Sequence, residues 1–187
     1  MYEIFADLHI HIGRSENGKP IKITGARSLN FANIAKECYE RKGIQVAGII
    51  DCASPYVIED IENFLKTGDA YELKDGGIIY KDKVCILLGS EVETSEKGRN
   101  GKSGSAHNVC FFPYLKDIKG FSNELAKHVK NVTLSTQRSD LSGYDLVDIV
   151  EKYNGIVIPA HIFTPHKSYY GNCTDRLKDI FKEKYDK

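Results

Sequence analysis

The sequence predicts an α/β fold in which strands and helices alternate through a single domain of residues 1–187. Short apolar runs bounded by glycine and proline alternate with segments of helical periodicity, and no low-complexity linker or repeat interrupts them. Polar side chains also gather where predicted strands end, which is where α/β folds carry their sites. The alternation favours right-handed crossovers and a largely parallel sheet, either open or curled into a barrel.

Local patterns of apolar and helix-breaking residues predict each element. The run IFADLHIHIG near the start predicts a strand. Ser28 is expected to cap a helix that continues to Lys42 and ends at Gly43. The polar, glycine-containing stretch 95–106 is expected to be a mobile loop. In chain order, the other expected elements are a strand at 45–51, a helix at 55–66, a hairpin over 76–92, a strand at 107–114, helices at 116–130 and 142–153, a strand at 155–161 and a helix at 175–184.

Composition excludes several classes of protein. Lys+Arg and Asp+Glu both number 26, so no overall charge draws the chain to nucleic acid or to an anionic membrane, and any nucleic-acid contact needs a local patch. No apolar run approaches membrane-spanning length, and no basic, apolar leader indicates secretion. The five cysteines are widely spaced without a C-x-x-C pair, which indicates reduced thiols in a cytoplasmic protein.

Three polar residues alternate along the first predicted strand. Asp7, His9 and His11 are two residues apart, so their side chains are expected to project from one face of the strand. Burying three polar groups on one face is costly without compensation, and two such imidazoles can hold one metal ion or an adjacent pair. The alternative is an edge strand whose polar face is simply solvated.

Further candidates for metal binding fall near the ends of the other predicted strands. They combine imidazole and carboxylate, which together suit zinc, manganese or iron, and a carboxylate can bridge two ions. Such a pair of ions stabilises the charge that develops on a phosphoryl group. These candidates are Asp51, Glu91, Glu93, His107 and His161.

Five motifs resemble those of the PHP (polymerase and histidinol phosphatase) domain family, in the same order along the chain. They are DLHIH at 7–11, Asp51 at a strand end, GSEVE at 89–93, His107 before NVCFF, and PAH at 159–161. The resemblance covers nearly the whole chain. It implies a PHP-type distorted (βα)7 barrel and metal-dependent phosphoester hydrolysis.

The resemblance also implies a site for two divalent ions, zinc first, with manganese, iron and magnesium as alternatives. Glu91 would bridge the two ions, and Asp51 would belong to a third site or support the other ligands. The expected catalytic residues are Glu91, His161 and Asp51. The implied ligands are His9, His11 and Glu91 for one ion, and Glu91, His107 and His161 for the other.

The later segment 134–171 has a narrower resemblance, to endonuclease Q and its bacterial relatives. The specific part is PAHIFTP followed by KSYYG, and TGARSLNFANI near the start fits the same group. Those are PHP proteins that nick DNA on the 5′ side of deaminated bases and of abasic sites. The resemblance therefore implies DNA as the partner of this chain, bound through a local patch.

The run KSYYG also carries side chains that suit nucleic acid. Its two tyrosines offer stacking faces, its lysine and serine can contact phosphate, and its glycine permits close approach of a backbone. An enzyme that examines a single base generally extrudes it into a pocket, which such a loop could help form. The basic loop 14–27 is a further candidate for phosphate contact, with a solvated surface as the alternative. The candidate substrate-binding residues are Lys167, Ser168, Tyr169, Tyr170, Gly171 and Arg138.

The chain departs from the PHP pattern at three places. No further His lies between His11 and His107, so a third metal site is expected to be poor or absent. Where many PHP proteins have Asp-His, this chain has Asp51 followed by Cys52, and a buried core thiol is favoured there over a soft metal ligand. No Asp-x-His motif follows His161, so the last expected ligand of the first metal is missing. With about six predicted strands, fewer than a closed barrel needs, the barrel is expected to be incomplete at its C-terminal end. A second copy in a homodimer, or the rest of a longer protein, is expected to cover the open edge.

These observations lead to one leading hypothesis and two alternatives. The leading hypothesis is a metal-dependent phosphoesterase of the endonuclease Q type, which cleaves DNA next to deaminated or damaged bases. One alternative is a small-molecule phosphate monoesterase of the histidinol-phosphatase type. The other is a truncated, non-catalytic PHP module that binds metal or DNA, and the missing Asp-x-His motif favours it.

Overall fold

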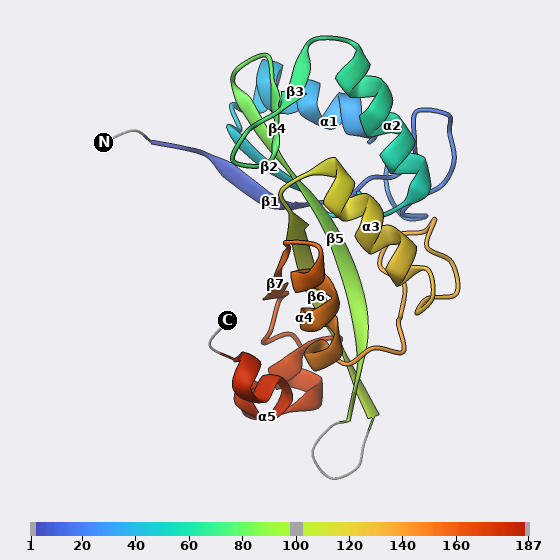
Figure 1. Cartoon of the computed structure of the whole chain (residues 1–187), viewed down its shortest axis with the longest axis vertical. Helices are drawn as coiled ribbons and strands as arrows, with labels where there is room; N and C mark the ends of the chain where they lie inside the picture. The colour runs from blue at the N-terminus through green and yellow to red at the C-terminus, as the bar shows by residue number, and fades with distance from the viewer. Residues whose placement is uncertain (1–2, 98–102, 186–187) are drawn as a thin grey trace.

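The computed structural model describes residues 3–97 and 103–185, and within them the chain forms a mixed α/β structure around a seven-stranded open sheet (Figure 1). No helix in these two ranges has both the length and the apolar character needed to cross a membrane. The strands are β1 (Ala6–Ile10), β2 (Val46–Ile49), β3 (Ala70–Glu72), β4 (Ile78–Tyr80), β5 (Val84–Lys97), β6 (Ser103–Phe112) and β7 (Ile156–Pro159).

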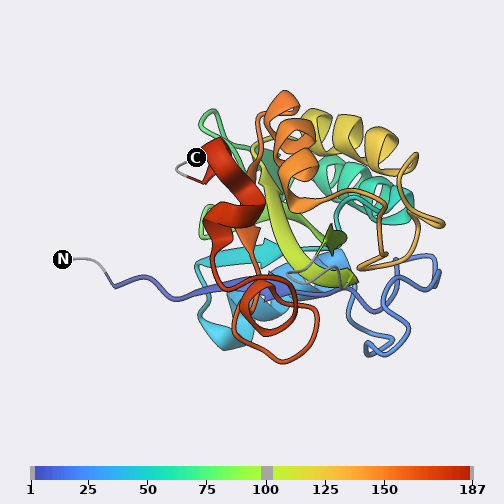
Figure 2. The same ribbon diagram turned by 90° about the horizontal axis from the view of Figure 1, so that it is seen from below.

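The helices pack mainly against one face of this sheet. α2, α3 and α4 lie side by side along it, as the two views in Figures 1 and 2 show. Between them and the sheet lies the main apolar core, which includes Phe31, Ile61, Leu88 and Phe121. The helices are α1 (Phe31–Glu37), continued by a π-helical turn (Cys38–Lys42), α2 (Pro55–Lys66), α3 (Leu115–Leu125), α4 (Gly143–Lys152) and α5 (Leu177–Phe181), with a π-helical turn at Tyr169–Cys173 and a 3-10 turn at Lys182–Lys184.

Several helix boundaries follow from local chemistry. The predicted helix at 55–66 is confirmed, with Pro55 in its first turn. Gly43 caps the first helical segment in the left-handed conformation, as predicted. The predicted N-cap at Ser28 is wrong: Asn30 caps α1, because its side chain accepts a hydrogen bond from the backbone N–H of Asn33 at 2.8 Å.

The sheet is mixed, so the prediction of a largely parallel sheet is wrong. β1 pairs with β2, and β2 with β5, in parallel. The pairings of β3 with β4, β4 with β5, β5 with β6 and β6 with β7 are antiparallel. The connections from β4 to β5 and from β5 to β6 are too short for a crossover, which parallel strands require. The predicted hairpin over 76–92 is confirmed as β4 and β5.

β5 is the long central strand, with 14 residues. Its first part lies between β2 and β4, and its second part pairs with β6 from Leu88 to Lys97. The mobile loop predicted for 95–106 is therefore wrong for 95–97 and 103–106, which are strand, while 98–102 lie outside the described residues. His107, predicted to begin its strand, lies inside β6 opposite Glu93.

The sheet curves but does not close into a barrel within the described residues. β1 pairs only with β2, and β7 only with β6, so each has one free edge there. Apolar side chains are exposed at both edges, including Leu8 on β1 and Ile156 and Ile158 on β7. The curvature nevertheless brings the two edge strands together at one end, where the ring centroids of His9 and His161 are 6.4 Å apart.

Gly48 allows β1 to lie close to β2. A Cβ atom at this position would lie 2.8 Å from Cα and from the carbonyl oxygen of Leu8, and 2.9 Å from the ring of Phe111. Because two of these contacts are with backbone atoms, the strand itself would have to move. We expect Gly48→Ala to lower the free energy of unfolding by about 1–3 kcal/mol, the usual cost of overpacking. Urea unfolding followed by circular dichroism measures this, and an unchanged midpoint would contradict it.

Candidate metal centre

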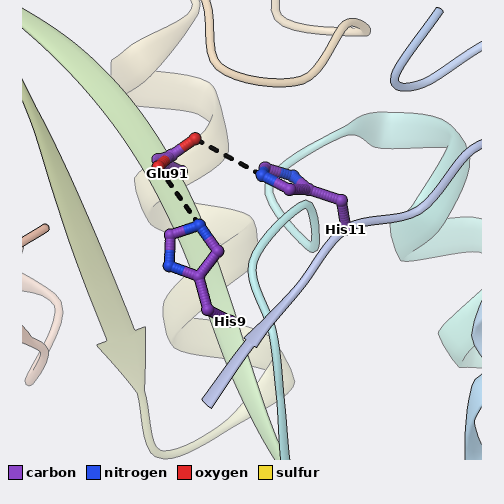
Figure 3. A group of neighbouring side chains, drawn as sticks. All are labelled: His9, His11 and Glu91. Carbon is purple, nitrogen blue, oxygen red and sulfur yellow. Dashed lines mark ion pairs between the residues drawn. The ribbon is translucent and has the colours of Figure 1, made fainter. Parts of the chain in front are cut away.

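A buried carboxylate, that of Glu91 on β5, lies among four imidazoles. Its Oε1 atom is 3.3 Å from Nε2 of His9, 3.2 Å from Nδ1 of His107 and 3.8 Å from Nε2 of His161. Its Oε2 atom is 3.5 Å from Nε2 of His11. Figure 3 shows His9 and His11 approaching Glu91 from β1 and the segment that follows it. The structure therefore brings together all five predicted metal ligands.

The four imidazoles come from three parts of the sheet: β1 and the residue after it, β6, and the segment that follows β7. β1 carries His9, and His11 follows one residue after its end. β6 carries His107, and His161 follows β7. Asp7, expected on the same face as the two histidines, is not part of the cluster: the pairing of β1 with β2 is irregular between Asp7 and Ile10, and the Asp7 carboxylate accepts the backbone N–H of His9 at 3.1 Å.

The spacing of these atoms is that of metal ligands. Two groups of possible ligands share Glu91: one with His9 and His11, the other with His107 and His161, and within each group the ligand atoms lie within 4.8 Å of one another. In the second group Nδ1 of His107 is also 3.2 Å from Nε2 of His161. Ligands at about 2.05 Å from a tetrahedral ion lie about 3.3 Å apart, which these distances approach.

Two buried atoms of the cluster have no hydrogen-bond partner among the described residues: Oε1 of Glu91 and Nε2 of His107. A buried polar atom without a partner carries a desolvation cost, and a cation between the imidazoles and Oε1 would remove it for Glu91. The donor set of imidazole nitrogen and carboxylate oxygen suits zinc, manganese or iron. The residues present thus fit a divalent metal.

Metal ligation needs a carboxylate and neutral imidazoles, and the pKa shifts favour these states for Glu91 and His161 but not for His9. Burial alone would raise the pKa of Glu91, but contacts with His107 and His9 and a hydrogen bond from Thr136 hold it well below its usual range. Burial, aided by the neighbouring His107, lowers the pKa of His161. The contact with Glu91 raises the pKa of His9, so a proton competes with a cation for that imidazole.

Asp51 orients His11. Its Oδ2 atom lies 3.0 Å from Nδ1 of His11 and also accepts the backbone N–H of Ile12 at 2.7 Å. Nδ1 therefore donates its proton to Asp51 in this hydrogen bond, and the lone pair is on Nε2, which lies 3.5 Å from Oε2 of Glu91. Asp51, predicted as catalytic, lies behind the imidazole and belongs to neither group of possible ligands in the described chain. The neighbouring Cys52 is fully buried and donates to the carbonyl of Ile49, which confirms a core thiol.

Contacts from two loops complete the surroundings of the site. Thr136 donates a hydrogen bond to Oε2 of Glu91 at 2.7 Å. Lys167 pairs with Glu93 at 2.8 Å, and Glu93 lies 3.6 Å from Nε2 of His107. Thr136, His161 and Lys167 all have positive φ, a costly conformation that gathers at functional sites. The sequence gives no sign of this backbone conformation, so Thr136 could not be predicted.

The predicted substrate loop is only partly available to a ligand. Tyr169 is 0% exposed and donates to Asn108 at 3.0 Å, and Ser168 is 0% exposed and donates to the carbonyl of Thr164. The stacking face predicted for Tyr169 and the phosphate contact predicted for Ser168 are thus absent, because both side chains pack inward. A Cβ at Gly171 would lie 1.9 Å from the same carbonyl, so this glycine serves the packing of the loop itself.

Other predicted contact residues remain at the surface. Tyr170 is half-buried and stacks on Phe163, with centroids 5.2 Å apart and rings 11° from parallel. Phe163, which sequence reasoning missed, is 79% exposed two residues after His161. Arg138 is exposed and donates to the hydroxyl of Ser95 at 3.2 Å.

Comparison with known proteins gives two curated relatives, and no family model matches the chain. The uncharacterized protein YqxK of Bacillus subtilis is 48% identical over 182 residues, which are 97% of this chain and 46% of YqxK. The uncharacterized protein MJ0043 of Methanocaldococcus jannaschii is 27% identical over 161 residues, which are 85% of this chain and 16% of that protein. The chain therefore spans less than half the length of either relative.

Two solved structures resemble the fold. The lesion-specific endonuclease PfuEndoQ from Pyrococcus furiosus matches with a TM-score of 0.73 and 23% identity, over 96% of this chain and 40% of that one. An endonuclease Q in complex with a 27-mer duplex substrate that has an abasic lesion at the active site matches with a TM-score of 0.72 and 23% identity, over 95% and 40%. The open α/β sheet of this chain is thus similar in fold to part of endonuclease Q.

Proposed function

We propose that the chain carries the metal centre of a phosphoesterase of the endonuclease Q type, which cleaves DNA phosphodiester bonds next to deaminated or damaged bases. The observation that carries this proposal is the buried Glu91 carboxylate, whose two oxygens lie 3.2–3.8 Å from four imidazole nitrogens. The fold likeness to a lesion-specific endonuclease supports the choice of substrate.

Two divalent ions, zinc first, with manganese, iron and magnesium as alternatives, would be held at this centre. His9, His11 and Glu91 would bind one, and Glu91, His107 and His161 the other. Such ions stabilise the negative charge that develops when a phosphoryl group is attacked. In this proposal Glu91 and His161, which are the expected catalytic residues, act as metal ligands.

The residues around the ligands hold the ligand side chains in the orientation that metal binding needs. Asp51 holds the proton on Nδ1 of His11, so that Nε2 is free to bind. Thr136 fixes one oxygen of Glu91, and Glu93 lies beside His107. Ligating residues held in this way lose little conformational entropy when an ion binds.

Nucleic acid as the substrate is supported by the aromatic pair beside His161. Phe163 is 79% exposed and lies flat on Tyr170. An exposed ring next to a phosphoester site offers a stacking face to a base. A small phosphate monoester needs no such face. In this proposal the DNA contacts the surface formed by the loop that follows β7.

Removing Glu91 as a ligand should weaken metal binding strongly. We expect wild-type protein to bind Zn²⁺ or Mn²⁺, and Glu91→Gln to bind either at least about 100-fold more weakly, because it loses the shared charged ligand. Isothermal titration calorimetry with elemental analysis before and after EDTA measures this. Glu62→Gln, an exposed carboxylate paired with Lys119, is the matched control and should bind as the wild type does. Equal binding by wild type and Glu91→Gln would contradict the proposal.

A cleavage assay tests whether damaged DNA is the substrate. We expect metal-loaded protein to nick duplexes with one uracil, hypoxanthine or abasic site, and His9→Ala to lose at least about 100-fold in rate while remaining folded. DNA affinity should fall steeply with salt. Cleavage of damaged and undamaged duplexes at equal rates would contradict lesion specificity. Hydrolysis of a simple phosphate monoester without nicking would indicate a histidinol-phosphatase type, and metal binding without hydrolysis a non-catalytic module.

A further inference from the structure

Lys22 lies against the lone pair that a metal would need. Its Nζ atom is 2.6 Å from Nε2 of His11, the nitrogen that faces Glu91. Because Asp51 holds the proton on Nδ1, Nε2 accepts the hydrogen bond and the lysine ammonium donates it. The ammonium group therefore occupies the lone pair that a cation bound to His11 would need.

The backbone of Lys22 is fixed, but its side chain is long. Ile21 donates to the carbonyl of Gly13, and Lys22 to that of Ile12, both at 3.0 Å, so this loop is tied to the segment that carries His11. The flexible four-carbon stem lets the ammonium move while the backbone stays in place. Lys22 is half-buried, whereas Lys19 in the same loop is exposed.

A hollow of about 260 Å³ lies next to this ammonium. It is rich in hydrogen-bond donors: two ammonium groups, three hydroxyls and an amide. Donors of this kind bind the oxygens of an anion, and ammonium groups bind them most strongly. The polar residues that line it are Lys22, Thr24, His107, Ser135, Thr136, Gln137 and Lys167.

The balance of charge around this hollow depends on whether metal is bound. Lys167 pairs with Glu93, while Lys22 contacts His11, which also contacts the carboxylates of Asp51 and Glu91. Without a cation the carboxylates are in excess, so an anion is not attracted. Two divalent ions would reverse the balance and, through like-charge repulsion, drive the Lys22 ammonium away from His11.

We propose that Lys22 is an anion-binding residue that metal loading releases. It donates to His11 when the centre holds no cation, and it turns into the adjacent hollow to bind a phosphoryl oxygen of the substrate when the ions are bound. This inference rests on the proposed function. Because linkage is reciprocal, phosphate should then strengthen metal binding as much as metal strengthens phosphate binding.

The test uses calorimetry to measure two affinities of the chain of residues 1–187: that of the metal-free protein for Mn²⁺, and that of the Mn²⁺-loaded protein for inorganic phosphate. We expect Lys22→Met to bind Mn²⁺ about fivefold more tightly, because no ammonium has to be displaced. The same variant should bind phosphate about tenfold more weakly, because a charge-assisted hydrogen bond is lost. Lys19→Met, in the same loop, is the matched control and should leave both affinities unchanged.

Tighter binding of Mn²⁺ together with weaker binding of phosphate distinguishes this role of Lys22 from a structural one. If Lys22→Met binds both Mn²⁺ and phosphate as the wild type does, or both more weakly, the inference is overturned even where the wild type binds metal and cleaves DNA. If the wild type binds no metal, the proposed function fails, and this inference fails with it. Circular dichroism of each variant verifies that it is folded.

Discussion

The contact of one buried carboxylate with several imidazoles is the constraint on which this structure depends. Glu91 is 4% exposed, and a carboxylate in that position is costly unless positive or hydrogen-bonding groups surround it. His9 and His107 supply such contacts, and Thr136 supplies a hydrogen bond. Since these residues are far apart in the sequence, the compensation exists only when β1, β5, β6 and the loop that carries Thr136 are assembled.

The mixed topology of the sheet makes this convergence possible. β5 carries Glu91 at its centre, the parallel strands β2 and β1 bring His9 from one side, and the antiparallel strand β6 brings His107 from the other. A sheet of parallel strands alone would place all the functional residues at carboxyl ends. Here the site lies where β5 continues beyond the end of β2 while it pairs with β6 along its other edge.

The sequence predicts much of the site but less of its surroundings. The alternation of His9 and His11 and the order of the motifs identify all five residues of the cluster, since ligand chemistry is local to short motifs. The long pairing of β5 with β6 could not be predicted, because the strand ends there are polar and glycine-rich instead of alternating with apolar residues. The burial of Tyr169 and the contact of Lys22 with His11 depend on tertiary packing, which no local pattern carries.

The position of Lys22 affects the metal affinity of the proposed centre. An ammonium group satisfies Nε2 of His11 before any ion arrives, so the centre has less unfavourable charge than its carboxylates alone would create. Metal binding at the proposed centre would therefore exchange one cation for another at His11, whereas the contacts of His107 and His161 are with each other and with the carboxylates of Glu91 and Glu93. Of the two groups of ligands, the one with His107 and His161 thus meets less competition, and it is the group we expect to bind the first ion.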